Sequence, residues 1–277
     1  MELEITEKHI LREPEFYNEN KAIVPELQQY YDNEPMGYFY KADTVEAIPH
    51  LLANWKEKFQ VIYMDPPFFT GQTFKFKQKV GVEGWRGDNK HILTHPAYSD
   101  RWESRESFLS MLRQVLRNSY ELLKPTGSIF LHLDYRFSSY ARIVMDEIFG
   151  EENLLNEIIW TYQSGGRAKK HFSRKHDTIL FYRKSADHFF NIEAVGKSRG
   201  TEKRNNMKKQ MDDEGRTFWS IRTNGKEYRY YEDSKIYPND VWDDISHLQQ
   251  KDPERTGYDT QKPEALLERI IKSTSQP

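Results

Sequence analysis

An acid followed by two prolines and an aromatic residue, Asp65-Pro66-Pro67-Phe68, is the part of the sequence best suited to chemistry. The apolar run at residues 61–64 before it predicts a buried strand of a parallel sheet. Neither proline can donate a backbone hydrogen bond, so strand pairing stops there. A carboxylate, an unpaired carbonyl and an aromatic face would then lie at the carboxyl end of a strand, where open α/β sheets bind ligands. Taken alone, Asp-Pro-Pro is also a common turn.

A stretch rich in Lys and Arg begins after Gly165-Gly166 and is the second candidate site. Residues 167–209 include thirteen Lys or Arg and four Asp or Glu. Lys and Arg neutralise phosphates, and aromatic faces stack on exposed bases, so nucleic acid is one interpretation. A solvated face on an ordinary loop is the other. The cations at the start of the stretch are Arg167, Lys169, Lys170, Arg174 and Lys175, with His171, Phe172 and His176 among them.

Composition and spacing exclude several familiar chemistries. The 277 residues include no cysteine, which excludes disulfides, thiolate zinc sites and a cysteine nucleophile. Neither glycine-rich phosphate-loop motif is present. His91 and His95 have the spacing of a zinc-binding helix, but Ile92 stands where such a site needs Glu, so we predict no metal site. The acidic amino terminus lacks a signal-peptide core and no stretch is long enough to span a bilayer, which fits a cytoplasmic protein.

Alternating strand and helix patterns predict the elements that position these residues. Thr44 is expected to cap the first helix. Together with the strands expected before and after it, this helix would form a βαβ unit of a parallel sheet at residues 38–64. Residues 69–104 have no clear period and predict a long loop, functional or disordered. Strands are expected at 38–43, 61–64, 128–134 and 154–162, and helices at 44–54, 106–123, 139–149 and 263–272, the last with Leu266, Leu267, Ile270 and Ile271 buried.

Four separated blocks together resemble the amino-group DNA methyltransferases of restriction–modification (Mod-like) systems, in the order of their β group. Asp65-Pro66-Pro67-Phe68 is similar to that family's (D/N/S)-P-P-(Y/F/W) tetrapeptide. Residues 123–134 (LKPTGSIFLHLD) are similar to the helix-to-strand block that follows it. The other blocks are 156–160 (NEIIW) with 165–167 and 175–180, and 257–264 (GYDTQKPE), where Asp259 replaces the usual proline. Four blocks in the correct order are far more specific than any one of them.

The resemblance implies a fold and a division of the chain. The fold is α/β, a Rossmann-like methyltransferase sheet with an inserted target recognition module. Residues 1–162 would form the catalytic portion, 163–252 the target recognition insertion and 253–277 the start of the cofactor-side portion. In the β group a glycine-rich F-x-G-x-G turn follows the last helix. The sequence ends at Pro277 before such a turn, so we expect an incomplete sheet and weak cofactor binding, which calorimetry would measure.

The resemblance also implies a reaction. The protein would transfer a methyl group from S-adenosylmethionine to the exocyclic amine of a base flipped out of double-stranded DNA. Asp65 and the Pro66 carbonyl would accept the hydrogens of the amine, Pro67 would complete the tetrapeptide, and Phe68 would stack on the base. In the family an Asp at the first position mostly accompanies adenine, which favours adenine N6. The alternatives are cytosine N4, a non-catalytic DNA-binding fragment, or an amide or RNA-base methyltransferase, although those last relatives typically carry Asn in place of Asp65.

The cofactor-binding candidates implied by the family pattern are Asp43, Asp65 and Lys262. An acid before a helix is also a common cap, and a lysine is often merely solvated, so both other interpretations stay open for Asp43 and Lys262. The basic residues from Arg167 to Lys175 would contact phosphates, with sequence readout between residues 185 and 252. The partners expected besides DNA are a second copy of the chain or a restriction subunit, without a membrane.

Overall fold

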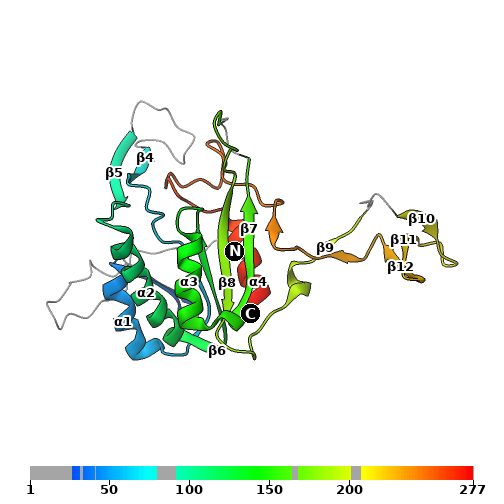
Figure 1. Ribbon diagram of the computed structural model, residues 1–277, viewed down its shortest axis with the longest axis horizontal. Coiled ribbons are helices and arrows are strands. Elements are labelled where there is room, and N and C mark those ends of the chain that lie inside the picture. Colours follow the sequence, from blue (N-terminus) through cyan, green and yellow to red (C-terminus); the bar gives the residue numbers. More distant parts are fainter. Residues whose placement is uncertain are drawn as a thin grey trace. The chain divides into compact units, whose positions relative to one another are not determined.

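The computed structural model describes residues 27–31, 34–40, 42–79, 92–163, 168–200 and 207–276 of the chain (Figure 1). The chain divides into two compact units. The described residues of the first unit lie within Met1–Lys75, Pro96–Glu157 and Thr178–His188, and those of the second within Phe76–His95, Ile158–Asp177 and Phe189–Pro277. The three functional portions predicted from the sequence stay a prediction.

The main sheet is mixed, with five strands in the order β14-β7-β8-β6-β3. Strand β3 (Phe59–Met64) runs parallel to β6 (Leu123–Leu133), with Ile62 opposite Ile129 and Met64 opposite Leu131. Strand β8 (His176–Arg183) is antiparallel to β6, and β14 (Val241–Trp242) is parallel to β7 (Leu154–Thr161). The predicted α/β class is therefore confirmed, and the strands expected at 61–64, 128–134 and 154–162 are present.

Three helices belong to the first unit: α1 (Thr44–Trp55), α2 (Arg105–Leu122) and α3 (Ser138–Phe149). Ser104 and Ser107 form a capping box at the start of α2, each side chain bonded to the other's backbone. Gly150 ends α3 with φ of 89°, a left-handed conformation that favours glycine. All three helices lie where the apolar periodicity predicted them, and α1 continues through Pro49 without a break.

The core of the first unit forms where α2 and α3 pack on β6 and β8. The middle of β6 is buried on both faces, as expected for a strand with neighbours on either side and helices across it. Phe130 of β6 stacks on Phe181 of β8, with ring centroids 4.3 Å apart. The side chains of this core with no exposed area are Phe108, Leu112, Leu116, Leu123, Ile129, Leu131, Leu133, Ala141, Met145, Leu180 and Tyr182.

Two predictions about the amino-terminal half are wrong. The strand expected at 38–43 is instead β2 (Glu34–Phe39), which pairs antiparallel with β1 (Leu27–Tyr31) in a separate two-stranded sheet. A short connection joins β1 to β2, so the two strands can pair directly, whereas pairing β2 parallel to β3 would need a crossover. No βαβ unit therefore forms. The stretch 69–104 is not one loop, because it contains the paired strands β4 (Thr73–Lys79) and β5 (Ile92–Ser99).

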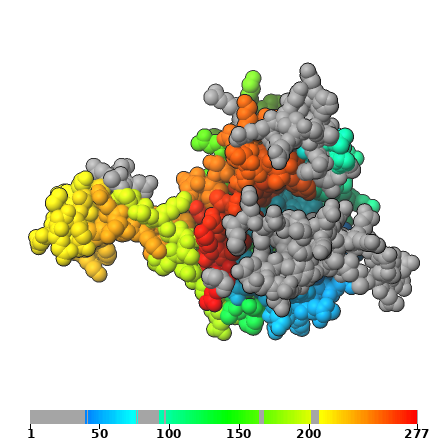
Figure 2. Space-filling model, turned by 180° about the vertical axis from the view of Figure 1, so that it is seen from behind, coloured from blue at the N-terminus to red at the C-terminus, as the bar shows by residue number. Residues whose placement is uncertain are grey.

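The second unit carries a small sheet of its own. Strands β10 (Lys208–Met211), β11 (Thr217–Thr223) and β12 (Lys226–Tyr231) pair antiparallel and appear in yellow in Figure 2. The short strands β9 (Lys197–Ser198) and β13 (Lys235–Ile236) pair with each other. In the sequence, β9 comes before this sheet and β13 comes after it. Single turns of 3-10 helix span Glu151–Asn153 in the first unit and Ile192–Val195 in the second.

Helix α4 (Glu264–Thr274) begins after Pro263, as predicted, but buries a narrower stripe than expected. Leu266 and Ile270 are buried, whereas Leu267 is half-buried and Ile271 is 54% exposed. The apolar stripe of an 11-residue helix faces one neighbour, so residues one position further round reach solvent. Of the described helices, none has the length and apolar composition needed to cross a bilayer.

An ion pair fastens α4 to the segment after β14. The guanidinium of Arg269, itself 8% exposed, donates two hydrogen bonds to the Asp244 carboxylate at 2.9 and 2.6 Å, and it lies over the Trp242 ring. The hydrogen bonds from Arg269 hold the pKa of Asp244 far below its ordinary value, and a hydrogen bond from Lys197 adds a smaller effect in the same direction. Replacing one partner would leave the buried guanidinium without its counter-charge.

We predict that Asp244→Asn destabilises the protein by about 1–2 kcal/mol, a charged hydrogen-bond contribution discounted for the partial exposure of Asp244. Because the folded-state pKa is depressed, this stability is present above the unfolded pKa and is lost as the pH falls through the acid range. Urea unfolding at neutral and acid pH measures it. Glu268→Gln, which removes an exposed pair with Lys272, is the matched control and should change little. Equal losses in both variants would contradict the assignment.

Candidate active site

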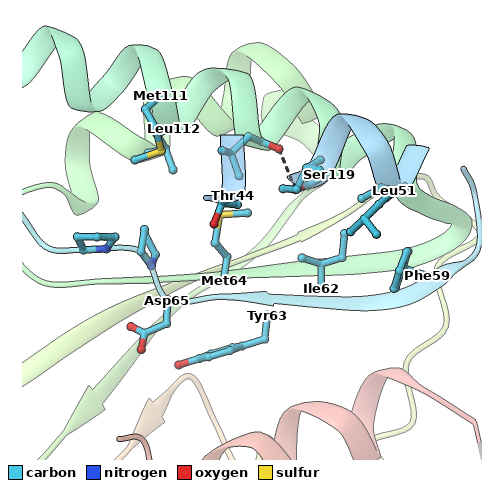
Figure 3. Close-up of a pocket in the computed structure, with 15 residues that line it drawn as sticks. Thr44, Leu51, Phe59, Ile62, Tyr63, Met64, Asp65, Met111, Leu112 and Ser119 are labelled. Carbon is cyan, nitrogen blue, oxygen red and sulfur yellow. Dashed lines mark hydrogen bonds between the residues drawn. The ribbon is translucent and has the colours of Figure 1, made fainter. Parts of the chain in front are cut away.

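The acid-proline-proline-phenylalanine segment lies at the carboxyl end of β3, as the sequence predicted. Ile62 and Met64 point from one side of β3 toward the helices, and Tyr63 and Asp65 point from the other side (Figure 3). This alternation is the period-two geometry of a strand. Asp65 is exposed, and the three residues after it are half-buried. The catalytic candidate therefore stands at a strand end where its carboxylate reaches solvent.

A buried histidine supports the aromatic end of this segment. His132 of β6 has no exposed area, and its Nδ1 shares a hydrogen bond of 2.7 Å with the Tyr63 hydroxyl. The His132 ring lies 5.8 Å from the Phe68 ring, centroid to centroid, at a tilt of 38°. Tyr63 and Phe68 are thus both fixed by one side chain of the neighbouring strand. The sequence placed His132 within one of the family blocks but gave it no role.

A second buried residue, Asp100, holds the chain just after the tetrapeptide. Its carboxylate accepts hydrogen bonds from the backbone amide of Phe69 at 2.8 Å and from the amide and hydroxyl of Thr70 at 2.7 Å each. The backbone of Asp100 adds bonds from the Gly71 amide and to the Gln72 carbonyl. Asp100 has no exposed area. Five hydrogen bonds therefore connect the start of the loop to the residue that follows β5.

These bonds hold an unfavourable backbone conformation. Phe69 has φ of 58°, a left-handed value that costs about 1 kcal/mol or more for a residue with a Cβ. The Phe69 ring compensates by packing against Phe137 and Phe108, at centroid distances of 5.0 and 6.2 Å. The turn redirects the chain immediately after Phe68, so Asp100 helps to fix where the tetrapeptide ends. No local sequence pattern marked Asp100, because its partners are about thirty residues away.

A cavity of about 430 Å³ lies between β3 and the helices α1 and α2. Its walls are mainly apolar side chains from the three elements, and its polar groups include Asp65, Thr44 and Ser119 (Figure 3). A largely apolar cavity with a few polar groups is typical of small-molecule sites. The principal apolar side chains that line it are Ile48, Leu51, Ile62, Met64, Met111 and Val115.

Asp43, a cofactor candidate, is the cap of α1. Its side chain accepts a hydrogen bond of 2.8 Å from the backbone amide of Val45. The expectation that Thr44 caps this helix is therefore wrong by one residue: Thr44 is the first helical residue and lines the cavity. The alternative interpretation of Asp43 as a helix-capping acid accounts for this hydrogen bond.

The remaining candidates belong to the second unit. Lys262 is half-buried and lies just before α4. Lys169, Lys170 and Arg174 are exposed, and Lys175 is half-buried; Arg167 lies outside the described residues. The Phe172 side chain among them is 97% exposed. An exposed ring among cations could stack on a base, although a single exposed apolar side chain is also ordinary on a protein surface.

Lys175 also lines a larger and more polar cavity of about 900 Å³ in the second unit. The Tyr162 ring in its wall lies 5.6 Å from the His247 ring and 5.4 Å from the Trp160 ring. Tyr162 is oriented by a hydrogen bond of 3.1 Å from its hydroxyl to the buried Asp177. In the part of the chain that the structure describes, no cluster of acids and histidines could hold a metal ion.

The mixed sheet, with an exposed acid before two prolines at a strand end, defines an α/β protein with a candidate site at the edge of its sheet. Residues 59–277 match the family model N6_N4_Mtase, described as DNA methylase. The chain belongs to this family. The family resemblance carried by the four blocks is therefore confirmed, and S-adenosylmethionine is the methyl donor of the family.

Curated relatives are similar over different shares of their lengths. The chain is 27% identical to the EcoP15I Mod subunit of Escherichia coli, a type III restriction-modification enzyme, over 53% of this chain and 24% of that one. It is 26% identical to the DNA adenine methyltransferase YhdJ of Escherichia coli K12, over 88% and 71%. It is 25% identical to the type II methyltransferase M.HpaI of Haemophilus parainfluenzae, over 84% and 58%. The chain thus spans about a quarter of the Mod subunit and just over half of M.HpaI.

Solved structures give a distant likeness. The PvuII DNA methyltransferase, named as cytosine-N4-specific, is 14% identical and covers 87% of this chain and 71% of its own, with a TM-score of 0.49. The M1.HpyAVI complex with S-adenosylmethionine has a TM-score of 0.43 at 16% identity, over 86% and 77%.

We predict that Asp100→Asn loosens the turn after the tetrapeptide, because an amide offers one acceptor oxygen where the carboxylate offers two. A loss of about 1–3 kcal/mol in unfolding free energy is expected for leaving a buried amide or hydroxyl unsatisfied. Hydrogen exchange should increase at Phe69 and Thr70. The exposed neighbour Glu103→Gln is the control. Unchanged exchange at both amides in Asp100→Asn would refute the role.

Proposed function

We propose that this protein methylates the exocyclic amino group of a DNA base, with Asp65 as the central catalytic residue. The observation that carries the proposal is the exposed Asp65 carboxylate at the carboxyl end of β3, followed by Pro66, Pro67 and Phe68. Membership in the DNA methylase family supports it. The exocyclic amine of a paired base is not accessible within the duplex, so the target base must leave the stack.

The chemistry required of the protein is mainly positioning. The lone pair of an exocyclic amine is delocalised into the base, which makes the nitrogen a poor nucleophile. The Asp65 carboxylate and the Pro66 carbonyl are acceptors that can take the two amine hydrogens and draw the nitrogen toward tetrahedral geometry. The half-buried Phe68, backed by His132, offers a ring on which the base can stack. Holding the nitrogen in line with the sulfonium methyl would lower the barrier. The N–C bond would form as the S–C bond breaks, a neutral thioether would leave, and the surplus proton on nitrogen would pass to Asp65 or to water.

Adenine N6 is the target we propose, and cytosine N4 is the alternative. The support for adenine is the Asp at the first position of the tetrapeptide together with the similarity to an enzyme named as an adenine methyltransferase. Cytosine N4 remains the alternative because Asp65 and the Pro66 carbonyl could accept the two amine hydrogens of either base. The methylated nucleoside found in the product DNA distinguishes adenine N6 from cytosine N4.

The 430 Å³ cavity beside Asp65 fits part of S-adenosylmethionine in size and in its mix of apolar walls with a few polar groups. When bound, this ligand supplies an electrophilic methyl group on a sulfonium. Thr44 is the polar residue that we propose to face it from within the cavity, and Met64 and Leu51 would pack against its apolar parts. Asp65, whose side chain leaves β3 on the side away from the helices, would meet it only at the edge of the cavity. We retain Asp43 and Lys262 as further candidates from the family pattern.

Double-stranded DNA is the partner that we propose for the basic stretch. Lys169, Lys170 and Arg174 are exposed and would neutralise phosphates, and Lys175 and Arg167 complete the predicted set. The similarity to Mod subunits favours a restriction–modification context, in which a second copy of the chain or a restriction subunit would be a partner. Such an enzyme would act in the cytoplasm, where the DNA is.

We predict that Asp65→Ala reduces methyl transfer about a hundredfold or more, since it removes a positioned acceptor at the reacting nitrogen. The measurement is transfer of labelled methyl from S-adenosylmethionine to DNA, with mass spectrometry of the nucleosides to separate N6-methyladenine from N4-methylcytosine. Asp187→Asn, an exposed acid of the same unit, is the matched control. Full activity in Asp65→Ala would disprove the catalytic assignment. A wild-type protein that binds DNA without methylating it would favour a DNA-binding role instead.

We predict that neutralising Lys169, Lys170 and Arg174 together to Gln weakens DNA binding and lowers its salt dependence. Removing a cation that neutralises one phosphate should reduce the slope of log K against log salt by about 0.9, so the slope of the triple variant should fall by about 2–3. Titration of a fluorescent duplex at several salt concentrations measures this slope. Gln at Lys235, Lys251 and Lys272 removes the same charge elsewhere in the second unit. An unchanged slope in the first triple variant would exclude these residues as phosphate ligands.

A further inference from the structure

The small sheet β10-β11-β12 has two faces of different electrostatic character. Residues directly opposite one another on antiparallel strands lie on the same face. Lys209 opposes Trp219, and Ile221 opposes Tyr228, so these four side chains share a face. The three strands contain a single acid, Glu227, and its side chain points to the opposite face, so no acid of these strands lies on this face. We call it the lysine face, formed by Lys209, Met211, Trp219, Ile221, Lys226 and Tyr228.

The opposite face combines the one acid of the three strands with two arginines that lie beside it. Arg229 donates a hydrogen bond of 3.1 Å to the Glu227 carboxylate, and Arg222 lies directly opposite Glu227 in the register. The bond from Arg229 lowers the pKa of Glu227, so this acid stays ionised. Lys208 is on the same side, since it opposes Ser220. We call this the paired face, and its acid lies beside the two arginines near the turn between β11 and β12.

The two lysines of the lysine face lie over aromatic rings instead of acids. The Lys209 ammonium is 5.5 Å from the centroid of Trp219, and the Lys226 ammonium is 5.4 Å from that of Tyr228. Among the described residues neither lysine has an acidic partner. A cation–π contact orients a lysine without cancelling its charge. The face therefore presents two oriented positive charges that remain available to an anion.

The apolar part of the lysine face is also accessible. Tyr228 is 43% exposed and Met211 is 69% exposed, whereas Trp219 beneath Lys209 is buried. Exposed rings bordered by cations are the combination that nucleic-acid surfaces use, since the cations meet phosphates and the rings meet sugars and bases. A protein partner with an acidic surface could meet the same charges, but it would not need an acid-free face with an exposed tyrosine beside one of the lysines.

We propose that the lysine face is a DNA-contacting surface, on which Lys209 and Lys226 neutralise phosphates and Tyr228 packs against the sugar or base between them. The inference rests on the proposed function of the protein as a DNA methyltransferase. It adds a contact surface distinct from the basic stretch at residues 167–175. It also predicts that the two sides of one small sheet contribute unequally to binding.

The test compares two double variants that remove equal charge from the same sheet. Lys209→Gln with Lys226→Gln neutralises the lysine face, and Arg222→Gln with Arg229→Gln removes the two cations that lie beside Glu227 on the paired face. The probe is a fluorescent duplex of random sequence, titrated at several salt concentrations with the full chain. The lysine-face variant should bind about tenfold or more weakly, with a salt slope lower by about 2. The paired-face variant should stay within about threefold of the wild type, because its cations are already partly neutralised.

Further measurements keep the outcomes separate. Lys209→Arg with Lys226→Arg preserves charge and should restore both affinity and slope, which excludes a folding defect as the cause. Equal losses in the two Gln variants, or no loss in the lysine-face variant, would overturn the inference while leaving the proposed function intact. A wild-type protein that does not bind the duplex at all would instead contradict the proposed function.

Discussion

The parallel pairing of β3 with β6 is the constraint on which the candidate site depends. The middle of β6 is buried on both faces, so its register is fixed by the core, and β3 takes its own register from it. Gln60 strengthens this register, because its side chain donates to the Thr126 carbonyl at 2.7 Å and accepts from the Thr126 hydroxyl at 3.0 Å. A shift by one residue would turn Asp65 toward the helices and Met64 toward solvent.

Two buried polar residues then convert a strand end into a defined site. His132 supports Tyr63 and Phe68 from β6, and Asp100 fixes the left-handed turn at Phe69. Both are expensive to bury without partners, and both have them. The prolines remove the competing strand hydrogen bonds, so the backbone between the two anchors is free to present the Pro66 carbonyl. Asp65, the proposed catalytic acid, stays exposed while the residues around it are fixed.

The second unit shows a different use of charge. At Asp244 and Arg269 opposite charges join α4 to the segment after β14, and the pair is structural. On the three-stranded sheet the cations are divided between a face with an acid and a face with rings. The first arrangement neutralises charge and the second preserves it. Under the role proposed for the lysine face, charge pairing separates residues that hold this unit together from residues that contact DNA.

The sequence by itself determined the elements whose signals are local. The apolar period set α2, α3 and the position of β3, and the tetrapeptide with its three companion blocks identified the family. The sequence could not reveal the role of Asp100 or His132, because their partners are about thirty and about seventy residues away and no local pattern records such contacts. It also missed the pairing of β1 with β2 and of β4 with β5, since short polar strands lack the period that marks buried ones. Only the tertiary structure decided which residue caps a helix, which cations are neutralised and which side of a strand meets solvent. These properties depend on what lies opposite each residue in space.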